Sequence, residues 1–151
     1  MRKYLVVVEE GASARSLRFG LLNLVSEQKG IELILLQTQD HYGGESEAEA
    51  RRDAVQSVAA IWAELVAMGL PVIDAIAGDP LPRKAIAAEM TAGRHRYDGI
   101  VLTSKAPGLL RMLHFDPAHQ LERRYQVPVV SIDPEAAPAI SRLAGAEGGR
   151  R

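Results

Sequence analysis

Short apolar runs alternate with longer stretches of helical periodicity along this chain, and this alternation constrains the fold more than any other sequence feature. The apolar runs are rich in β-branched residues, which is typical of strands buried on both faces of a sheet. Strands that alternate with helices form crossover units, so we expect an α/β fold. We predict an open, doubly wound, five-stranded parallel sheet of Rossmann-like type, with strand order 3-2-1-4-5 and helices on both faces. The predicted strands are 4–8, 31–36, 72–77, 99–102 and 127–132.

Helical periodicity and capping signals place the helices between these strands. Ser13 can cap a helix that stops at Gly30, and a long helix is expected over 45–68, where Gly69 ends it. A third helix is expected over 83–91. On the long helix, residues at helical spacing predict one core-facing side, made of Val55, Val58, Ala59, Trp62, Leu65 and Val66.

Length and composition restrict the class of protein. The 151 residues suit one domain, predicted over 1–133, followed by a flexible tail rich in Ala, Gly and Pro over 134–151. A net charge of -1 gives no reason to expect a nucleic-acid or membrane partner. The chain has no cysteine, which excludes disulfides and Cys-ligated zinc, and no apolar run could span a bilayer. The start MRKYLVVVEE lacks a signal-peptide pattern, so we expect a cytoplasmic protein.

In an open sheet of this kind, ligands bind beyond the carboxyl ends of the strands, at the switch in strand order. Here that crevice would lie between the first and fourth strands, bordered by the segments 9–12, 37–43, 78–80 and 102–117. No catalytic or metal-ligating residues are predicted. The candidate ligand-binding residues are Glu10, Gly11, Gly78, Asp79, Thr103, Lys105, Gly108, Arg111 and Asp116.

Five segments in order resemble the universal stress protein family, and together they cover residues 3–133. They are VVVEEGASARSLR, the GDP tripeptide at 78–80, RYDGIVLTS, the long segment GLLRMLHFDPAHQLERRYQ and the strand VPVVSI. The resemblance implies the sheet topology predicted above and a homodimer. It also raises the question of nucleotide binding, because the family contains members that bind ATP and members that do not.

The ATP-binding members resemble one another in a motif, G-x-x-G-x(9)-G-[ST], that follows the fourth strand. Laid on this chain, its four key positions fall at Leu102, Lys105, Phe115 and Asp116, so all four depart from the motif. Three side chains would enter space where glycines let backbone amides approach phosphates. Asp116 precedes Pro117 and would cap the next helix, taking amides that a phosphate needs and adding a like charge. The resemblance is therefore to the members without the ATP motif.

These observations lead to one function hypothesis and leave two others open. The first is a stress-response or regulatory protein that acts by protein contacts through partners still to be found, with a degenerate nucleotide cradle and no cofactor. The alternative is a sensor that binds ATP, another nucleotide or an anion in a shifted pose, through Lys105, Arg111 and the Gly78–Asp79 loop. An enzyme on this scaffold is the third, and we do not expect it because no nucleophile or acid–base pattern is present.

The fifth strand would be an edge strand, short and apolar with a proline near its start. An exposed apolar edge favours pairing with another strand, and the simplest partner is a second copy of the chain. We therefore predict a homodimer. The interface residues would be Val127, Val129, Val130, Ser131 and Ile132.

Other polar residues suggest no separate site. The four histidines, His41, His95, His114 and His119, form no i, i+4 pair of the kind that ligates zinc, and we expect them at the surface or in loops. An acidic pair ends the first strand, as in receiver domains, but the fifth strand offers no lysine. The basic segment GRHRY at 93–97 is expected to be a solvated helix end.

Overall fold

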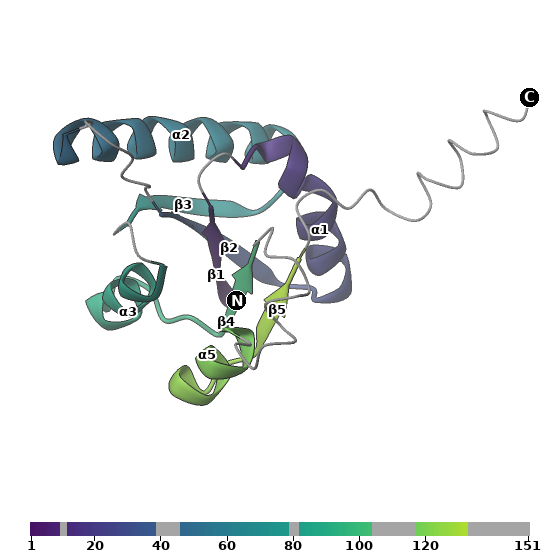
Figure 1. Ribbon diagram of the computed structural model, residues 1–151. Coiled ribbons are helices and arrows are strands. Elements are labelled where there is room, and N and C mark those ends of the chain that lie inside the picture. The colour runs from purple at the N-terminus through teal and green to yellow at the C-terminus, as the bar shows by residue number, and fades with distance from the viewer. Residues whose placement is uncertain (10–11, 39–45, 79–81, 104–116, 133–151) are drawn as a thin grey trace, which may run out of the picture.

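A computed structural model of the chain describes residues 1–9, 12–38, 46–78, 82–103 and 117–132. Five parallel strands form one sheet in the order β3-β2-β1-β4-β5 (Figure 1), which confirms the predicted topology. The observed fifth strand is shorter than predicted. The strands are β1 (Arg2–Val8), β2 (Ile31–Gln37), β3 (Val72–Ala77), β4 (Gly99–Leu102) and β5 (Val129–Ser131).

Helices cover both faces of this sheet (Figure 1). Side chains between the sheet and α1 and α2 form one hydrophobic core, here named the α1/α2 core. Those between the sheet and α3 and α5 form a second, the α3/α5 core. The helices are α1 (Ala14–Glu27), α2 (Glu47–Ala67), α3 (Pro82–Ala92) and α5 (Pro117–Tyr125).

Strand β1 shows why the apolar runs are continuous. Tyr4, Val6 and Val8 point into the α1/α2 core, whereas Leu5 and Val7 point into the α3/α5 core. Both faces of a central parallel strand are covered by helices, so every position must be apolar. The unbroken run LVVV is the consequence.

The predicted core face of α2 was partly wrong. Val55 and Val66 are 48% and 49% exposed, and Ala59 is exposed as well, so none of the three lies in the core. The buried stripe is rotated from the predicted one and includes two alanines, Ala50 and Ala54, that the pattern did not count. Its members are Ala50, Ala54, Val58, Ile61 and Leu65.

The two edge strands are β3 and β5. β5 pairs only with β4, with Val130 opposite Val101, and its neighbour Ile132 donates its N–H to Leu102 O at 2.9 Å. Within the residues described, no helix is both long and apolar enough to cross a membrane.

Candidate functional site

The ligand crevice was predicted at the carboxyl ends of the strands. Of the nine candidate residues there, the structure describes Gly78 and Thr103. The other seven candidates, Glu10, Gly11, Asp79, Lys105, Gly108, Arg111 and Asp116, lie outside the described residues.

Thr103 follows β4 at the centre of this edge and is only 2% exposed. Its hydroxyl donates a hydrogen bond to the backbone carbonyl of Val7, at the end of the neighbouring β1, over 2.5 Å. Because the hydroxyl proton is committed to Val7, this side chain ties β4 to β1 at the switch in strand order. Only its oxygen lone pairs remain to accept a further bond.

Gly78 directly follows β3 and donates its N–H to Gln37 O at 2.8 Å. A Cβ atom at this position would lie 2.9 Å from both Ala85 Cβ and Leu36 Cδ1. Such contacts are closer than van der Waals packing allows, so the lack of a side chain lets α3 approach the sheet here. The GDP tripeptide thus begins with a glycine that packing requires.

Ser13 is the N-cap of α1, as predicted. Its hydroxyl accepts the N–H of Ser16 at 3.1 Å, and the Ser16 hydroxyl accepts the N–H of Ser13 at 3.1 Å, which completes a capping box. Glu9 O also accepts the N–H of Ala12 at 3.2 Å. These contacts occupy backbone donors at the start of α1, beside the predicted crevice.

Gln37 is a polar residue at this edge that the sequence interpretation did not single out. It is buried at the end of β2, and its Nε2 donates to Ser57 Oγ on α2 at 3.1 Å. Its Oε1 is buried without a hydrogen-bond partner among the described residues. The sequence signal that could have identified Gln37 was a glutamine at the end of a mainly apolar strand, IELILLQ.

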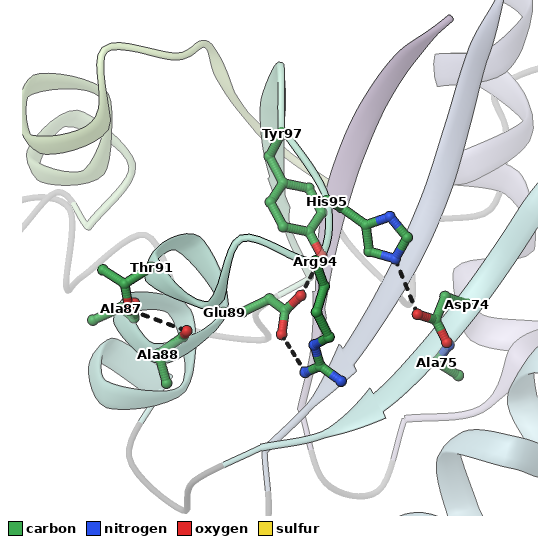
Figure 2. Close-up of polar contacts among 9 residues, drawn as sticks. All are labelled: Asp74, Ala75, Ala87, Ala88, Glu89, Thr91, Arg94, His95 and Tyr97. Carbon is green, nitrogen blue, oxygen red and sulfur yellow. Dashed lines mark hydrogen bonds and ion pairs between the residues drawn. The ribbon is translucent and has the colours of Figure 1, made fainter.

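The segment GRHRY is not a simple solvated helix end, contrary to expectation. Figure 2 shows Arg94 and Tyr97 turned toward Glu89 on α3, and His95 turned toward Asp74 on β3. Glu89, buried on α3, accepts the Tyr97 hydroxyl at 2.6 Å and Arg94 Nη2 at 2.7 Å. Burial raises the pKa of Tyr97 well above its usual range, and the hydrogen bond to Glu89 raises it further. The hydrogen bond to Glu89 likewise raises the pKa of Arg94.

His95 lies beside this group, and its Nε2 is 3.0 Å from Asp74 Oδ2 (Figure 2). Its ring meets Tyr97 edge-on at 5.9 Å. The other ring nitrogen, Nδ1, is buried without a partner among the described residues. The contact between His95 and Asp74 joins the turn before β4 to β3. In the part of the chain that the structure describes, no three acidic or histidine side chains could hold a metal ion.

The predicted dimer residues surround the outer edge of the sheet. Val127 and Val129 pack against the α3/α5 core, and Val130 and Ile132 pack against the α1/α2 core. Ser131 is exposed. The four apolar side chains are each half-buried, so part of their surface stays accessible beside the outer backbone of β5.

No protein-family model matches the sequence, and no curated protein matches it. The solved structures that share its fold include the following three. A universal stress protein family protein from Arabidopsis thaliana, with AMP bound, is 18% identical, with a TM-score of 0.54 over 88% of this chain and 92% of that one. A universal stress protein from Archaeoglobus fulgidus is 15% identical, with a TM-score of 0.50 over 88% and 94% of the two chains.

The third structure is the universal stress protein from Archaeoglobus fulgidus in complex with dAMP. It is 14% identical, with a TM-score of 0.52 over 88% of this chain and 98% of that one. Each comparison spans nearly the whole of both chains, and each agrees with the five-stranded order found here. The chain therefore has the fold of the universal stress proteins.

Proposed function

We propose that this chain is a regulatory protein of the universal stress protein type, which acts through protein contacts as a homodimer and has no glycine-lined ATP cradle. In this proposal residues 1–133 form the working domain, residues 134–151 form a flexible tail, and the protein acts in the cytoplasm. The observation that carries the proposal is the position of Leu102, where ATP-binding members have their first motif glycine.

Leu102 is the last residue of β4, and its backbone belongs to the sheet. It lies opposite Val7 on one side and Ser131 on the other. Its carbonyl accepts the N–H of Ile132 at 2.9 Å, and its side chain packs against the α3/α5 core. A residue held by two neighbouring strands and a core cannot adopt the open backbone of a phosphate loop.

The inward bond of Thr103 supports the same conclusion. Its hydroxyl proton is bound to Val7 O, so the first polar side chain after β4 offers no hydroxyl donor to a phosphate. Beyond it the sequence supplies Lys105, Phe115 and Asp116 in place of two glycines and a hydroxyl residue. The carboxylate of Asp116 would repel a triphosphate in the family's usual pose.

A nucleotide sensor is the second candidate. AMP and dAMP are bound in two of the structures that share the fold. A monophosphate carries less charge than a triphosphate, and Lys105 and Arg111 could hold it by charge-assisted hydrogen bonds without a backbone cradle. In this candidate the Gly78–Asp79 loop and Thr103 would border the ligand.

Calorimetric titration of the purified protein with AMP, and separately with ATP and magnesium, decides between the two. No binding at millimolar concentrations of either nucleotide is the result expected for a protein that acts by protein contacts. Micromolar binding of AMP that is lost in Lys105→Ala, and kept in Lys29→Ala, would overturn that proposal in favour of the sensor. Lys29 is a matched control because it is exposed and follows α1, at the opposite end of the sheet.

A double variant tests whether the rewritten motif is what blocks nucleotides. Lys105→Gly with Asp116→Ser removes one side chain and one negative charge from the cradle. We expect this variant to bind ATP measurably more tightly than the original chain does. If its binding stays undetectable while the protein remains folded, these two residues are not the block.

A further inference from the structure

The outer edge of β3 carries backbone groups that do not face β2. Gly78 donates its N–H to Gln37 O, and backbone direction alternates along a strand, so Ala75 directs its N–H away from β2. Nearer the start of β3, its pairing register with β2 shifts between Leu33 and Ile34 of β2. Because of that shift Leu33 N–H bonds to Pro71 O at 2.9 Å, which leaves the Val72 carbonyl free of β2.

The Val72 carbonyl is bound by a side chain of α2. Trp62 Nε1 donates a hydrogen bond to Val72 O at 2.9 Å. The indole also packs against the α1/α2 core, which holds it in place. The outer edge of β3 is therefore hydrogen-bonded at Val72 by a side chain from the sheet face that α1 and α2 cover.

The Ala75 N–H is bound from the other face. It donates to Asp74 Oδ1 at 2.8 Å, and His95 Nε2 lies 3.0 Å from the other carboxylate oxygen of Asp74 (Figure 2). His95 comes from the turn between α3 and β4, and its side chain is mostly buried. The imidazole thus fixes the carboxylate in the position from which it covers the amide.

We infer that Trp62 and the Asp74–His95 pair close the β3 edge against the addition of another strand. β3 is an edge strand of six residues that exposes 38% of the apolar Ile73, which makes it a template for pairing with its own copy. An incoming strand would have to displace the indole at Val72 and the carboxylate at Ala75, three residues apart. Assembly through sheet edges is thereby restricted to β5.

The β5 edge differs in the contacts that the structure gives it. Val129 N–H donates to Glu122 Oε1 at 3.2 Å, a longer bond than either contact on β3. It comes from a partly exposed glutamate on the adjacent α5. No second side chain is described that fixes this carboxylate as His95 fixes Asp74.

The test is self-association of the full chain with both contacts removed. Trp62→Phe keeps the aromatic packing without the N–H, and Asp74→Ala removes the carboxylate. We expect the double variant to form species larger than the parent chain, with a mass that rises with concentration in sedimentation velocity. The matched control is Trp62→Phe with Asp74→Asn, because the asparagine Oδ1 can still accept the Ala75 N–H; its self-association should be markedly weaker.

The comparison is made both in the parent chain and in a background with Ser131→Pro, so that its outcome does not depend on whether β5 forms a dimer. A folded Trp62→Phe, Asp74→Ala variant that keeps the parent's mass at the highest attainable concentration would overturn the inference. So would equal association of the alanine and asparagine variants.

Hydrogen exchange gives a second test that needs only a single substitution. The Ala75 amide should exchange about tenfold faster in Asp74→Ala, a factor typical for the loss of one hydrogen bond. The Gly78 amide, which is bound to β2, should not change. An unchanged exchange rate at Ala75 would show that the carboxylate does not protect the edge.

Discussion

Ile132, at the end of β5, packs directly against Gly20 in the middle of α1. A Cβ atom on Gly20 would lie 2.8 Å from Ile132 Cδ1 and 2.9 Å from Ile132 Cβ. A mid-helix glycine lowers helix propensity, so its presence needs a packing reason, and the close approach of β5 supplies one. The lack of a side chain at Gly20 therefore lets the end of β5 pack closely on α1.

Gly20→Ala should lower the free energy of unfolding, although alanine favours the helix. Overpacking typically costs about 1–3 kcal/mol, against a propensity gain of about 1 kcal/mol. Urea unfolding followed by circular dichroism measures the change. In an Ile132→Ala background the same Gly20→Ala change should cost less, because the Cδ1 and Cγ2 atoms that it would meet are gone. A gain in stability for Gly20→Ala alone would contradict the packing account.

Gly78→Ala should destabilise the fold by about 1–3 kcal/mol through contact with Leu36 and Ala85. Ala85 Cβ is attached to the α3 backbone and cannot rotate away, so α3 would have to shift. Thermal unfolding without added ligand is the measurement. Unchanged stability would mean that the space is not needed for packing, and the glycine would then be better explained by a ligand.

Tyr97→Phe should lower the free energy of unfolding at pH 7 by about 1.5–3 kcal/mol, because the hydroxyl donates to a buried carboxylate. The loss should shrink at high pH. The folded-state pKa of Tyr97 is raised, so its contribution is present in full below the unfolded pKa, near 10.

Above that pH the unfolded chain loses the Tyr97 proton and the folded chain keeps it. The stability of the parent protein should therefore fall by about 1.4 kcal/mol per pH unit from this group, and that of Tyr97→Phe should lack this part of the slope. Urea unfolding of both proteins between pH 8 and 11, values chosen to bracket the unfolded pKa, measures the difference. A gap that stays constant over this range would show that Tyr97 ionises as freely in the folded state as in the unfolded state.

Ser131→Pro should prevent the dimer proposed through β5 and leave the fold intact. Pro128 O and Ile132 N–H both bond to β4, so by alternation Ser131 directs its N–H outward. Proline removes that donor at an edge, where folded sheets tolerate it. We expect a mass of 16.4 kDa for this variant, against twice that value for the parent and for Ser131→Ala. Equal masses for all three would place any interface elsewhere.

Much of the fold could be predicted because periodicity and capping signals act locally. The runs VIDAIA and GIVL match β3 and β4 residue for residue, and Ser13 caps α1 as expected. The face of α2 could not be predicted in the same way. Val55 and Val66 have the right chemistry for a core, but the side of α2 that is buried instead includes the alanines at 50 and 54.

The site shows the same division. The chemistry proposed for the site rests on Leu102, Lys105, Phe115 and Asp116, which can be identified in the sequence. The hydrogen bond from Thr103 to Val7 could not be predicted from the sequence. Nor could the hydrogen bonds that Tyr97 and Arg94 donate to Glu89. Thr103 and Val7 are 96 positions apart in the chain, and no local pattern links them.

By itself, the sequence determined the order of strands and helices, the parallel sheet and the absence of glycine from positions 102, 105 and 115, because each depends on residue type and short-range spacing. The tertiary structure alone decided which edge groups are covered. Trp62, Asp74 and His95 come from α2, β3 and the turn before β4, and they meet on one strand only after the crossovers have brought these elements together. Hydrogen bonds between such distant segments follow from the packing of whole helices on the sheet, which residue spacing does not encode.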